Sequence, residues 1–154
     1  MTAHPVDDLP FVDEHRILTP APVPAVWRAL ARQLAGSRQR GTVALARLLA
    51  ATPHARSGTP LDQGATLPGF AVTAAVPGRL VRLTGRHRFS RYALVFTLVG
   101  RPDGTLVSAR TYAEFPGPHG RLYRLLVIGS GGHRAVVRRM LRDIRRRAER
   151  DSPA

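Results

Sequence analysis

The stretch from residue 69 to residue 115 limits the fold more than any other part of the sequence. Its apolar residues alternate with polar ones along segments that short turns separate. Pro77-Gly78 and Pro102-Asp103-Gly104 are typical turn sequences. No segment between the turns has room for the crossover helix that parallel strands need. The sequence therefore predicts an antiparallel meander with strands over residues 69–76, 80–85, 88–99 and 105–115.

Alternation also predicts which face of a strand is buried, because successive side chains point to opposite faces. In the third strand one face carries the large apolar residues and is the better core face: Tyr92, Leu94, Phe96 and Leu98. In the fourth strand we expect the core face to be formed by Val107, Ala109, Thr111, Ala113 and Phe115. The more polar residues between them are expected to face outward.

The segment before the meander predicts a strand and two short helices. A strand is expected over residues 11–18, followed by a cluster of prolines and a helix over residues 23–34, whose Trp27 should face the core. A second short helix is predicted over residues 42–51. The proline-rich segment 52–68 is long for a loop, so it either has a function or contains a short strand.

The C-terminal part predicts a long helix over residues 119–148 with a weak point at residues 129–132, Gly-Ser-Gly-Gly. Each glycine costs a helix roughly 1 kcal/mol relative to alanine. Either the helix breaks there or another part of the chain packs close to its backbone. Beyond the weak point an apolar stripe is expected to lie on the sheet: Val136, Val137, Met140, Leu141, Ile144 and Ala148.

A chain of 154 residues is long enough for one domain with a sizeable core. We expect an N-terminal tail over residues 1–10, a single domain over 11–150 and a C-terminal tail over 151–154. The absence of cysteine excludes disulfides, thiolate catalysis and cysteine-ligated metals. The N-terminus lacks the features of a secretory signal, and no apolar stretch is long enough to span a bilayer. A cytoplasmic protein with no membrane span is expected.

The net charge of +14 indicates either an anionic partner or a biased composition. All 24 basic residues are arginine, which is expected where GC-rich codons are favoured. The arginines are densest near the C-terminus, where they would mostly form a solvated helix face. No aromatic residue follows Tyr123, whereas RNA-binding surfaces stack bases on exposed aromatics. Nucleic acid is therefore not the expected partner, although binding of nucleic acid or an acidic partner through this helix stays a third alternative.

Motifs for cofactors and catalysis are incomplete. The string LLVIGSGG, residues 125–132, resembles a dinucleotide-binding turn, but arginine stands where the third glycine is needed and no second strand follows. The six histidines are scattered without metal-binding spacing. Ser130 lies outside any nucleophile elbow. We therefore expect no nucleotide cofactor, no metal and no serine triad.

Two segments of the sequence, together with the order of its elements, resemble a known family. The segments are ILTPAPVPAVWRAL, residues 17–30, and GRLYRLLVIGSGGHRAVVRRMLRDIRRRA, residues 120–148. The first looks like the first strand of the START-like, or SRPBCC, helix-grip superfamily running through a proline corner into a helix. The second is similar to the closing helix of a small bacterial branch of uncharacterised function. The resemblance implies an α+β helix-grip fold, with a curved antiparallel sheet wrapped around a long C-terminal helix and short N-terminal helices. It covers most of the chain, and its motifs are structural rather than catalytic.

The resemblance also implies a cavity between the sheet and the last helix. Family members that use this cavity include lipid and sterol carriers, polyketide aromatases and cyclases, and hormone receptors. Residues placed to line such a cavity are Trp27, Tyr92, Phe96, Thr111, Tyr123 and His133. His87 and Arg88, near a hairpin, would lie at its mouth. Each aromatic also has the simpler interpretation of core packing, and His87 and Arg88 that of ordinary surface residues.

The favoured function is binding of a small hydrophobic molecule in this cavity. The alternative is a cyclase- or aromatase-like enzyme on a polyketide-like or other apolar substrate, in which His133, Tyr92 or Tyr123 exchanges a proton. Such an enzyme would be of the cyclase or dehydratase type and would need no metal or nucleotide. The absence of a clear acid–base pair favours binding over catalysis. The sequence identifies neither the ligand nor the oligomeric state.

Overall fold

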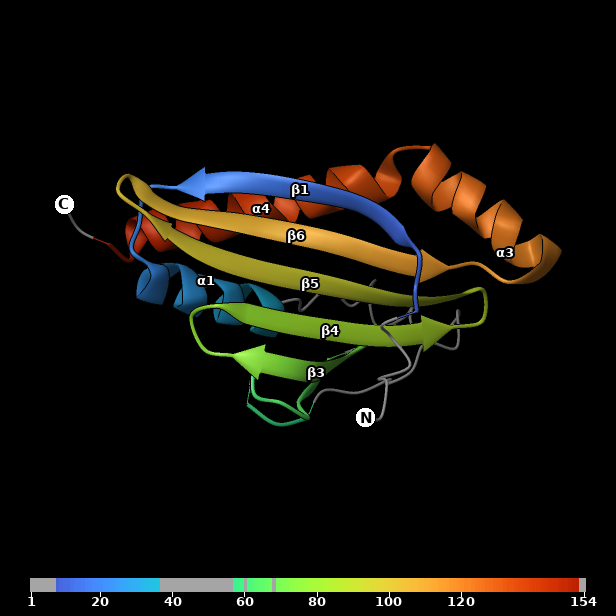
Figure 1. Ribbon diagram of the computed structural model, residues 1–154, viewed down its shortest axis with the longest axis horizontal. Coiled ribbons are helices and arrows are strands. Elements are labelled where there is room, and N and C mark those ends of the chain that lie inside the picture. Colours follow the sequence, from blue (N-terminus) through green and yellow to red (C-terminus); the bar gives the residue numbers. More distant parts are fainter. Residues whose placement is uncertain (1–7, 37–56, 60, 68, 153–154) are drawn as a thin grey trace.

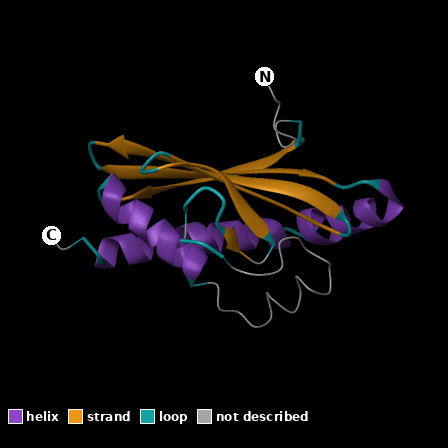
Figure 2. Cartoon of the chain, turned by 90° about the horizontal axis from the view of Figure 1, so that it is seen from below, coloured by secondary structure: helices purple, strands orange, loops and turns teal. Residues whose placement is uncertain are grey.

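The computed structural model describes residues 8–36, 57–59, 61–67 and 69–152. Its strands form one antiparallel sheet of six strands in the order β1-β6-β5-β4-β3-β2. The described helices lie in a single layer against one face of this sheet (Figures 1 and 2). The strands are β1 (Phe11–Thr19), β2 (Thr66–Leu67), β3 (Phe70–Val76), β4 (Leu80–His87), β5 (Ser90–Arg101) and β6 (Gly104–Glu114).

The predicted meander is confirmed, and its strands begin and end close to the predicted residues. β3 to β6 are joined in chain order, and β4 turns into β5 where His87 pairs with Ser90. The N-terminal strand β1 forms the edge of the sheet next to β6, the last strand of the meander, and pairs with it so that Ile17 lies opposite Val107. Two segments distant in the sequence therefore form one edge of the sheet.

The helical segments among the described residues are α1 (Val23–Ala35), α3 (Gly117–Arg124), the π-helical turn η1 (Leu125–Gly129) and α4 (Gly132–Arg150). α1 starts after Pro22 and ends where the amide of Gly36 donates to the carbonyl of Arg32. The corner between β1 and α1 is tied to β6, because the buried Thr105 hydroxyl donates to the carbonyl of Ala21 over 2.7 Å. This bond ties the corner before α1 to the sheet.

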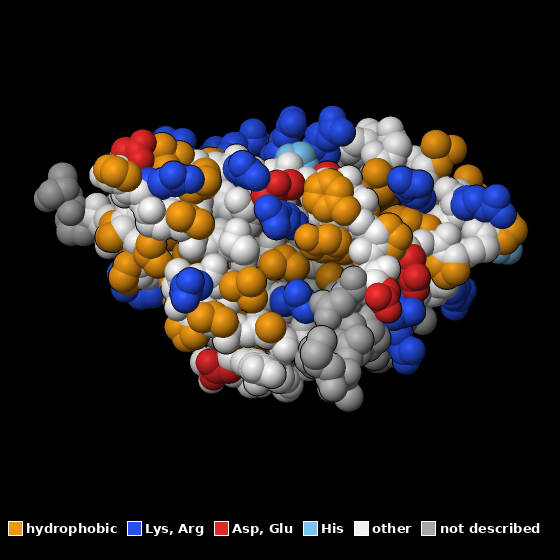
Figure 3. All heavy atoms as spheres, viewed as in Figure 1, with side chains coloured by type: hydrophobic (Ala, Val, Ile, Leu, Met, Phe, Trp, Pro, Cys, Tyr) orange, Lys and Arg blue, Asp and Glu red, His pale blue; other side chains and the backbone are white. Residues whose placement is uncertain are grey.

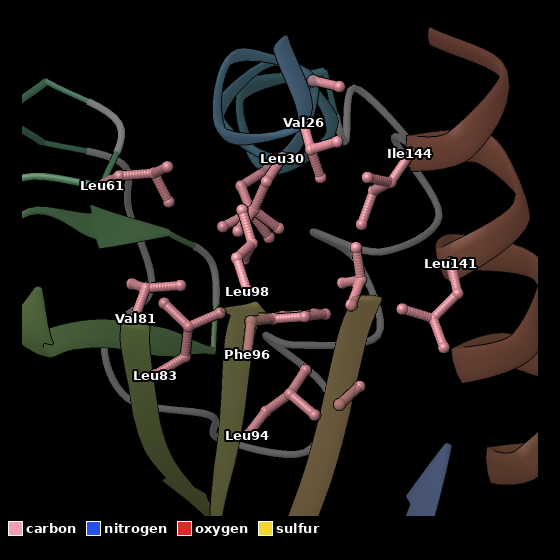
Figure 4. Packing of buried hydrophobic residues seen from close by; sticks show 14 of the residues in the cluster. Val26, Leu30, Leu61, Val81, Leu83, Leu94, Phe96, Leu98, Leu141 and Ile144 are labelled. Atoms are coloured by element: carbon pink, nitrogen blue, oxygen red, sulfur yellow. The ribbon is translucent and has the colours of Figure 1, made fainter. Parts of the chain in front are cut away.

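The core lies between the sheet and the α1–α4 helix pair. Val26 and Leu30 of α1 point toward the middle of β5, and Ile144 of α4 approaches the same region from the side (Figure 4). Phe96 of β5 has no exposed surface. The predicted core faces are confirmed, since the core cluster includes Leu94, Phe96, Leu98, Val107 and Ala109.

The C-terminal helix is interrupted, so of the two alternatives for the glycine-rich segment the break is the one the structure has. Ser130 and Gly131 separate η1 from α4, and Gly131 has a φ of 79°, a conformation that favours glycine. The Ser130 hydroxyl donates to the carbonyl of Leu126 and ends the turn. The helix therefore breaks at the predicted weak point, and α3 and α4 are separate helices (Figure 1).

Two other predictions concern the region before the meander. The predicted helix over residues 42–51 lies outside the described residues. Part of the segment 52–68 is described, and it contains the short strand β2, preceded by a bridge between Ser57 and Thr66. Within the described part of the chain, no helix is both long and apolar enough to cross a membrane.

Candidate functional site

A cavity of about 240 Å³ lies between the inner face of the sheet and the C-terminal helices. Its sheet side is lined by residues of β3 to β6, among them Phe70, His87, Tyr92, Leu94, Thr111 and Ala113. Its helix side is lined by Tyr123 of α3, Val127 and Ile128 of η1 and His133 of α4. The cavity therefore lies where the broken helix crosses the sheet, away from the packed α1 end.

The Tyr92 side chain lies across β4, and it can do so because Gly85 of β4 has no side chain. Its hydroxyl donates to the carbonyl of Gly69 over 2.6 Å, passing the position of Gly85. A Cβ on Gly85 would lie 1.9 Å from that carbonyl oxygen and 2.8 Å from the Tyr92 hydroxyl. Burial, together with the neighbouring Tyr123, raises the pKa of Tyr92 to about 12. Tyr92 is therefore a neutral phenol whose proton is already engaged.

Aromatic rings from the β4–β5 hairpin and α3 form the outer wall. The Tyr123 ring lies edge-to-face against His87 at 4.7 Å between centroids and stacks with Phe89 at 5.6 Å. The Nδ1 atom of His87 accepts the amide of Phe89 over 3.1 Å. Burial lowers the pKa of His87 and raises that of Tyr123, so both side chains favour their uncharged forms.

A polar cluster lies at the opposite side of the cavity, where α4 begins over the β1–β6 edge. The Nε2 atom of His133 is 3.0 Å from the Thr111 hydroxyl and 3.6 Å from Oδ1 of Asp13. His15 contacts the other oxygen of Asp13 over 3.1 Å. Oδ1 of Asp13 is buried and has no hydrogen-bond partner in the structure. His133 therefore lines the cavity and also lies close to the carboxylate of Asp13, which does not line it.

Asp13 and His15 are residues that sequence reasoning missed. Both lie on β1, whose register is irregular between Phe11 and Asp13 and which pairs Asp13 with Thr111. Alternation along β1 alone places the two residues on one face. It does not show that this face meets His133, because the pairing of β1 with β6 joins segments about a hundred positions apart.

The predicted site residues separate into two groups. His87, Tyr92, Thr111, Tyr123 and His133 all line the cavity. The others lie elsewhere: Trp27 packs against the core from α1, Phe96 is buried inside it, and Arg88 borders a separate open hollow of about 430 Å³ beside the start of α3.

These placements follow from position along the elements. Trp27 and Phe96 lie at the α1 end of the layer, and Arg88 follows the last residue of β4 with an exposed side chain. Among the residues described, no group of three histidine or acidic side chains is arranged to hold a metal ion.

Solved structures with the same architecture exist. Protein MLL2253 from Mesorhizobium loti superposes with a TM-score of 0.56 at 15% identity, over 92% of this chain and 98% of that one. A protein from Rhizobium leguminosarum superposes with a TM-score of 0.55 at 14% identity, over 90% and 93% of the two chains. No family model matches the sequence, and no curated protein does.

A further similar structure is the di-domain ARO/CYC StfQ from the steffimycin biosynthetic pathway. It superposes with a TM-score of 0.58 at 14% identity, over 94% of this chain and 52% of that one. The present chain therefore has the α+β helix-grip fold that the sequence predicted. At these identities the likeness is one of fold.

Proposed function

We propose that the protein binds a small hydrophobic molecule in the cavity between the sheet and the C-terminal helices. The observation that carries this proposal is the cavity itself, which has an apolar and aromatic lining with a few polar groups at its two ends. Ligand sites are commonly concave and apolar with a small number of convergent polar groups. The similar ARO/CYC structure supports the proposal at the level of the fold.

The lining favours an uncharged ligand. Arginine accounts for all 24 basic residues of the chain, yet no described residue that lines the cavity is arginine, aspartate or glutamate. The residues that line the cavity and have shifted pKa values are His87, Tyr92 and Tyr123, and each is shifted toward its neutral form. A charged ligand would lose its hydration in this cavity without gaining a partner charge.

The cavity volume limits the size of the ligand. Pockets for drug-sized molecules usually measure about 300–1,000 Å³. At about 240 Å³, this cavity suits a molecule below that size, such as one with up to three aromatic rings. The rings of Tyr123 and His87 provide faces and edges against which a flat ligand packs.

Mass spectrometry of the purified protein tests the proposal. The mass under native conditions is compared with the mass under denaturing conditions, after expression in a native or related host. A stoichiometric small molecule that is lost on denaturation is expected, and its identity shows whether it is a reactant, a product or an inert lipid. A native mass equal to the denatured mass, with no binding of added small aromatic compounds, contradicts the proposal.

A second candidate is an enzyme of the cyclase or aromatase type. The observation that favours it is the polar cluster, in which His133 lies between the cavity, the Thr111 hydroxyl and the partly buried carboxylate of Asp13. A positioned imidazole near a carboxylate is suited to transfer a proton to or from a bound molecule. Turnover of the ligand identified above should then fall on His133→Leu and Tyr92→Phe substitution. Unchanged turnover in both variants contradicts the catalytic role.

A further inference from the structure

The arm formed by α3 and η1 carries apolar side chains both on the side that faces the cavity and on the side that faces outward. Tyr123, Val127 and Ile128 point inward and line the cavity. On the outward side, Leu122, Leu125 and Leu126 are 57%, 66% and 63% exposed. We call these three leucines the leucine face. The arm extends beyond the ends of the strands, so the leucine face projects from one end of the molecule (Figure 1).

The surroundings of the leucine face are positively charged. Arg121 and Arg124 lie on the same arm with exposed side chains. The sequence contains no acidic residue from position 115 to position 142, a segment in which all the ionisable residues other than tyrosine are arginine or histidine. Hydrophobic and basic side chains lie next to each other over the α3 end of the molecule (Figure 3).

We propose that the leucine face docks on the surface of an anionic lipid bilayer. Helices that lie at a bilayer surface combine bulky apolar residues on one face with arginine or lysine beside them, as this arm does. The leucines would enter the boundary between headgroups and acyl chains. Arg121 and Arg124 would lie at the level of the lipid phosphates, where the negative surface potential attracts them.

Charge distinguishes this partner from a second copy of the chain. Two copies packed through the leucine face would bring Arg121 and Arg124 of each chain together, without acidic residues on the arm to pair with them. A net charge of +14 adds repulsion between the two copies. The same charges attract an anionic membrane. The leucine face and the positive charge around it therefore both favour an anionic membrane over a second copy of the chain.

Docking would place the cavity beside the membrane. One helix diameter, about 10–12 Å, separates the outward leucines from the inward side chains that line the cavity. An apolar ligand would then pass between the bilayer and the cavity around this arm. This source for the ligand rests on the proposed function, whereas docking itself does not.

The test is co-sedimentation of the full chain with vesicles of phosphatidylcholine and phosphatidylglycerol in equal parts, and with vesicles of phosphatidylcholine alone. The main variant is Leu122→Ser/Leu125→Ser/Leu126→Ser. Its matched control replaces three exposed apolar residues of the opposite end, Leu18→Ser/Val76→Ser/Val99→Ser. A third variant is Arg121→Gln/Arg124→Gln. Fluorescence of Trp27, the single tryptophan, checks that each variant is folded.

The wild-type protein and the control variant should bind the anionic vesicles and not the neutral ones. The leucine variant should bind at least about tenfold more weakly, and the arginine variant roughly fivefold more weakly for each arginine removed. Equal binding by the leucine variant overturns the proposal, because attachment would then depend on charge alone. Self-association in solution that the leucine variant abolishes also overturns it, in favour of a second copy.

Binding of N-phenyl-1-naphthylamine, a neutral apolar probe, is measured in parallel without vesicles. The probe should bind equally to the wild type and to the leucine and arginine variants, since the substituted side chains point away from the cavity. If vesicle binding follows the expected pattern but neither the wild type nor any variant binds the probe, docking is supported and the proposed function is contradicted. The two proposals can therefore fail separately.

Discussion

The two ends of the layer between sheet and helices differ in how they are filled. At the α1 end, aliphatic side chains from α1, α4 and the sheet surround Phe96, which has no exposed surface. At the α3 end, rings from the β4–β5 hairpin and α3 surround a cavity of about 240 Å³. The same strands pass through both ends. Stability therefore depends mainly on one end of the sheet, which leaves the other free to hold a ligand.

The largest expected effect comes from truncating an aromatic residue at each end. Phe96→Ala should lower the free energy of unfolding by about 3–5 kcal/mol, because the tightly packed core cannot close the space. Phe115→Ala, which removes a partly buried ring beside the existing cavity, should cost about 1–2 kcal/mol. Denaturant unfolding of both variants measures the difference. Equal losses would contradict the distinction between the two ends.

Gly85→Ala should have the next largest effect. The new Cβ would lie 1.9 Å from the carbonyl oxygen of Gly69, so β3 or β4 has to shift. We expect a loss of about 1–3 kcal/mol in the free energy of unfolding. Gly100→Ala is the matched control, because its Cβ would lie 3.6 Å from the nearest atom, a methyl of Val23. If the control variant loses as much stability as Gly85→Ala, close approach at Gly85 is not the cause.

Tyr92→Phe tests the hydrogen bond that crosses β4. Removing the hydroxyl leaves the carbonyl of Gly69 without this donor and should cost about 1 kcal/mol. Tyr123→Phe removes a hydroxyl from a more exposed ring and should change stability by less than about 0.5 kcal/mol. Absorbance titration of the tyrosines should also lose, in Tyr92→Phe, the component with a pKa of about 12. Its persistence in that variant would show that another tyrosine carries the raised pKa.

The smallest expected effect is a dependence of stability on pH at the cavity wall. Burial lowers the pKa of His87 below its ordinary value of 6.5 in the folded chain. When the pH falls below about 6.5, His87 binds a proton more readily in the unfolded chain than in the folded one. His87 therefore lowers the free energy of unfolding at acidic pH and leaves it unchanged at pH values well above 6.5. His87→Gln should therefore lose less stability than the wild type between about pH 7 and about pH 5.

The control for this prediction is His119→Gln, which replaces an exposed histidine of α3. Its loss of stability on acidification should equal that of the wild type. Denaturant unfolding at both pH values measures the three proteins. If His87→Gln behaves as the wild type does, the burial of His87 has no energetic consequence for folding.

The sequence predicted the fold well where the information is local. The turn sequences and the alternation predicted the meander and its core face, and the apolar spacing after the proline corner predicted α1. The predicted bounds of these elements agree with the observed ones within a few residues. The glycines at residues 129–132 marked the weak point of the last helix. Whether the helix breaks there depends on how α3 and α4 pack, and so required the structure.

The cavity was predicted less completely, for two physical reasons. Alternation places Tyr92 and Phe96 on the same face of β5, but it does not show that α1 covers one of them and α3 the other. The polar cluster depends on the pairing of β1 with β6, which brings Asp13 opposite Thr111. No local pattern encodes a contact between such distant segments. Asp13 and His15 were missed for this reason.

The measurement that tests the central claim most directly is binding of N-phenyl-1-naphthylamine to cavity-filled variants. Ala113→Leu adds volume inside the cavity, and Val95→Leu adds it in a hollow on the outer face of the sheet. We predict one bound probe per chain in the wild type and in Val95→Leu, and loss of binding in Ala113→Leu, with unchanged Trp27 fluorescence throughout. Undiminished binding in a folded Ala113→Leu variant would contradict the claim that this cavity is the ligand site.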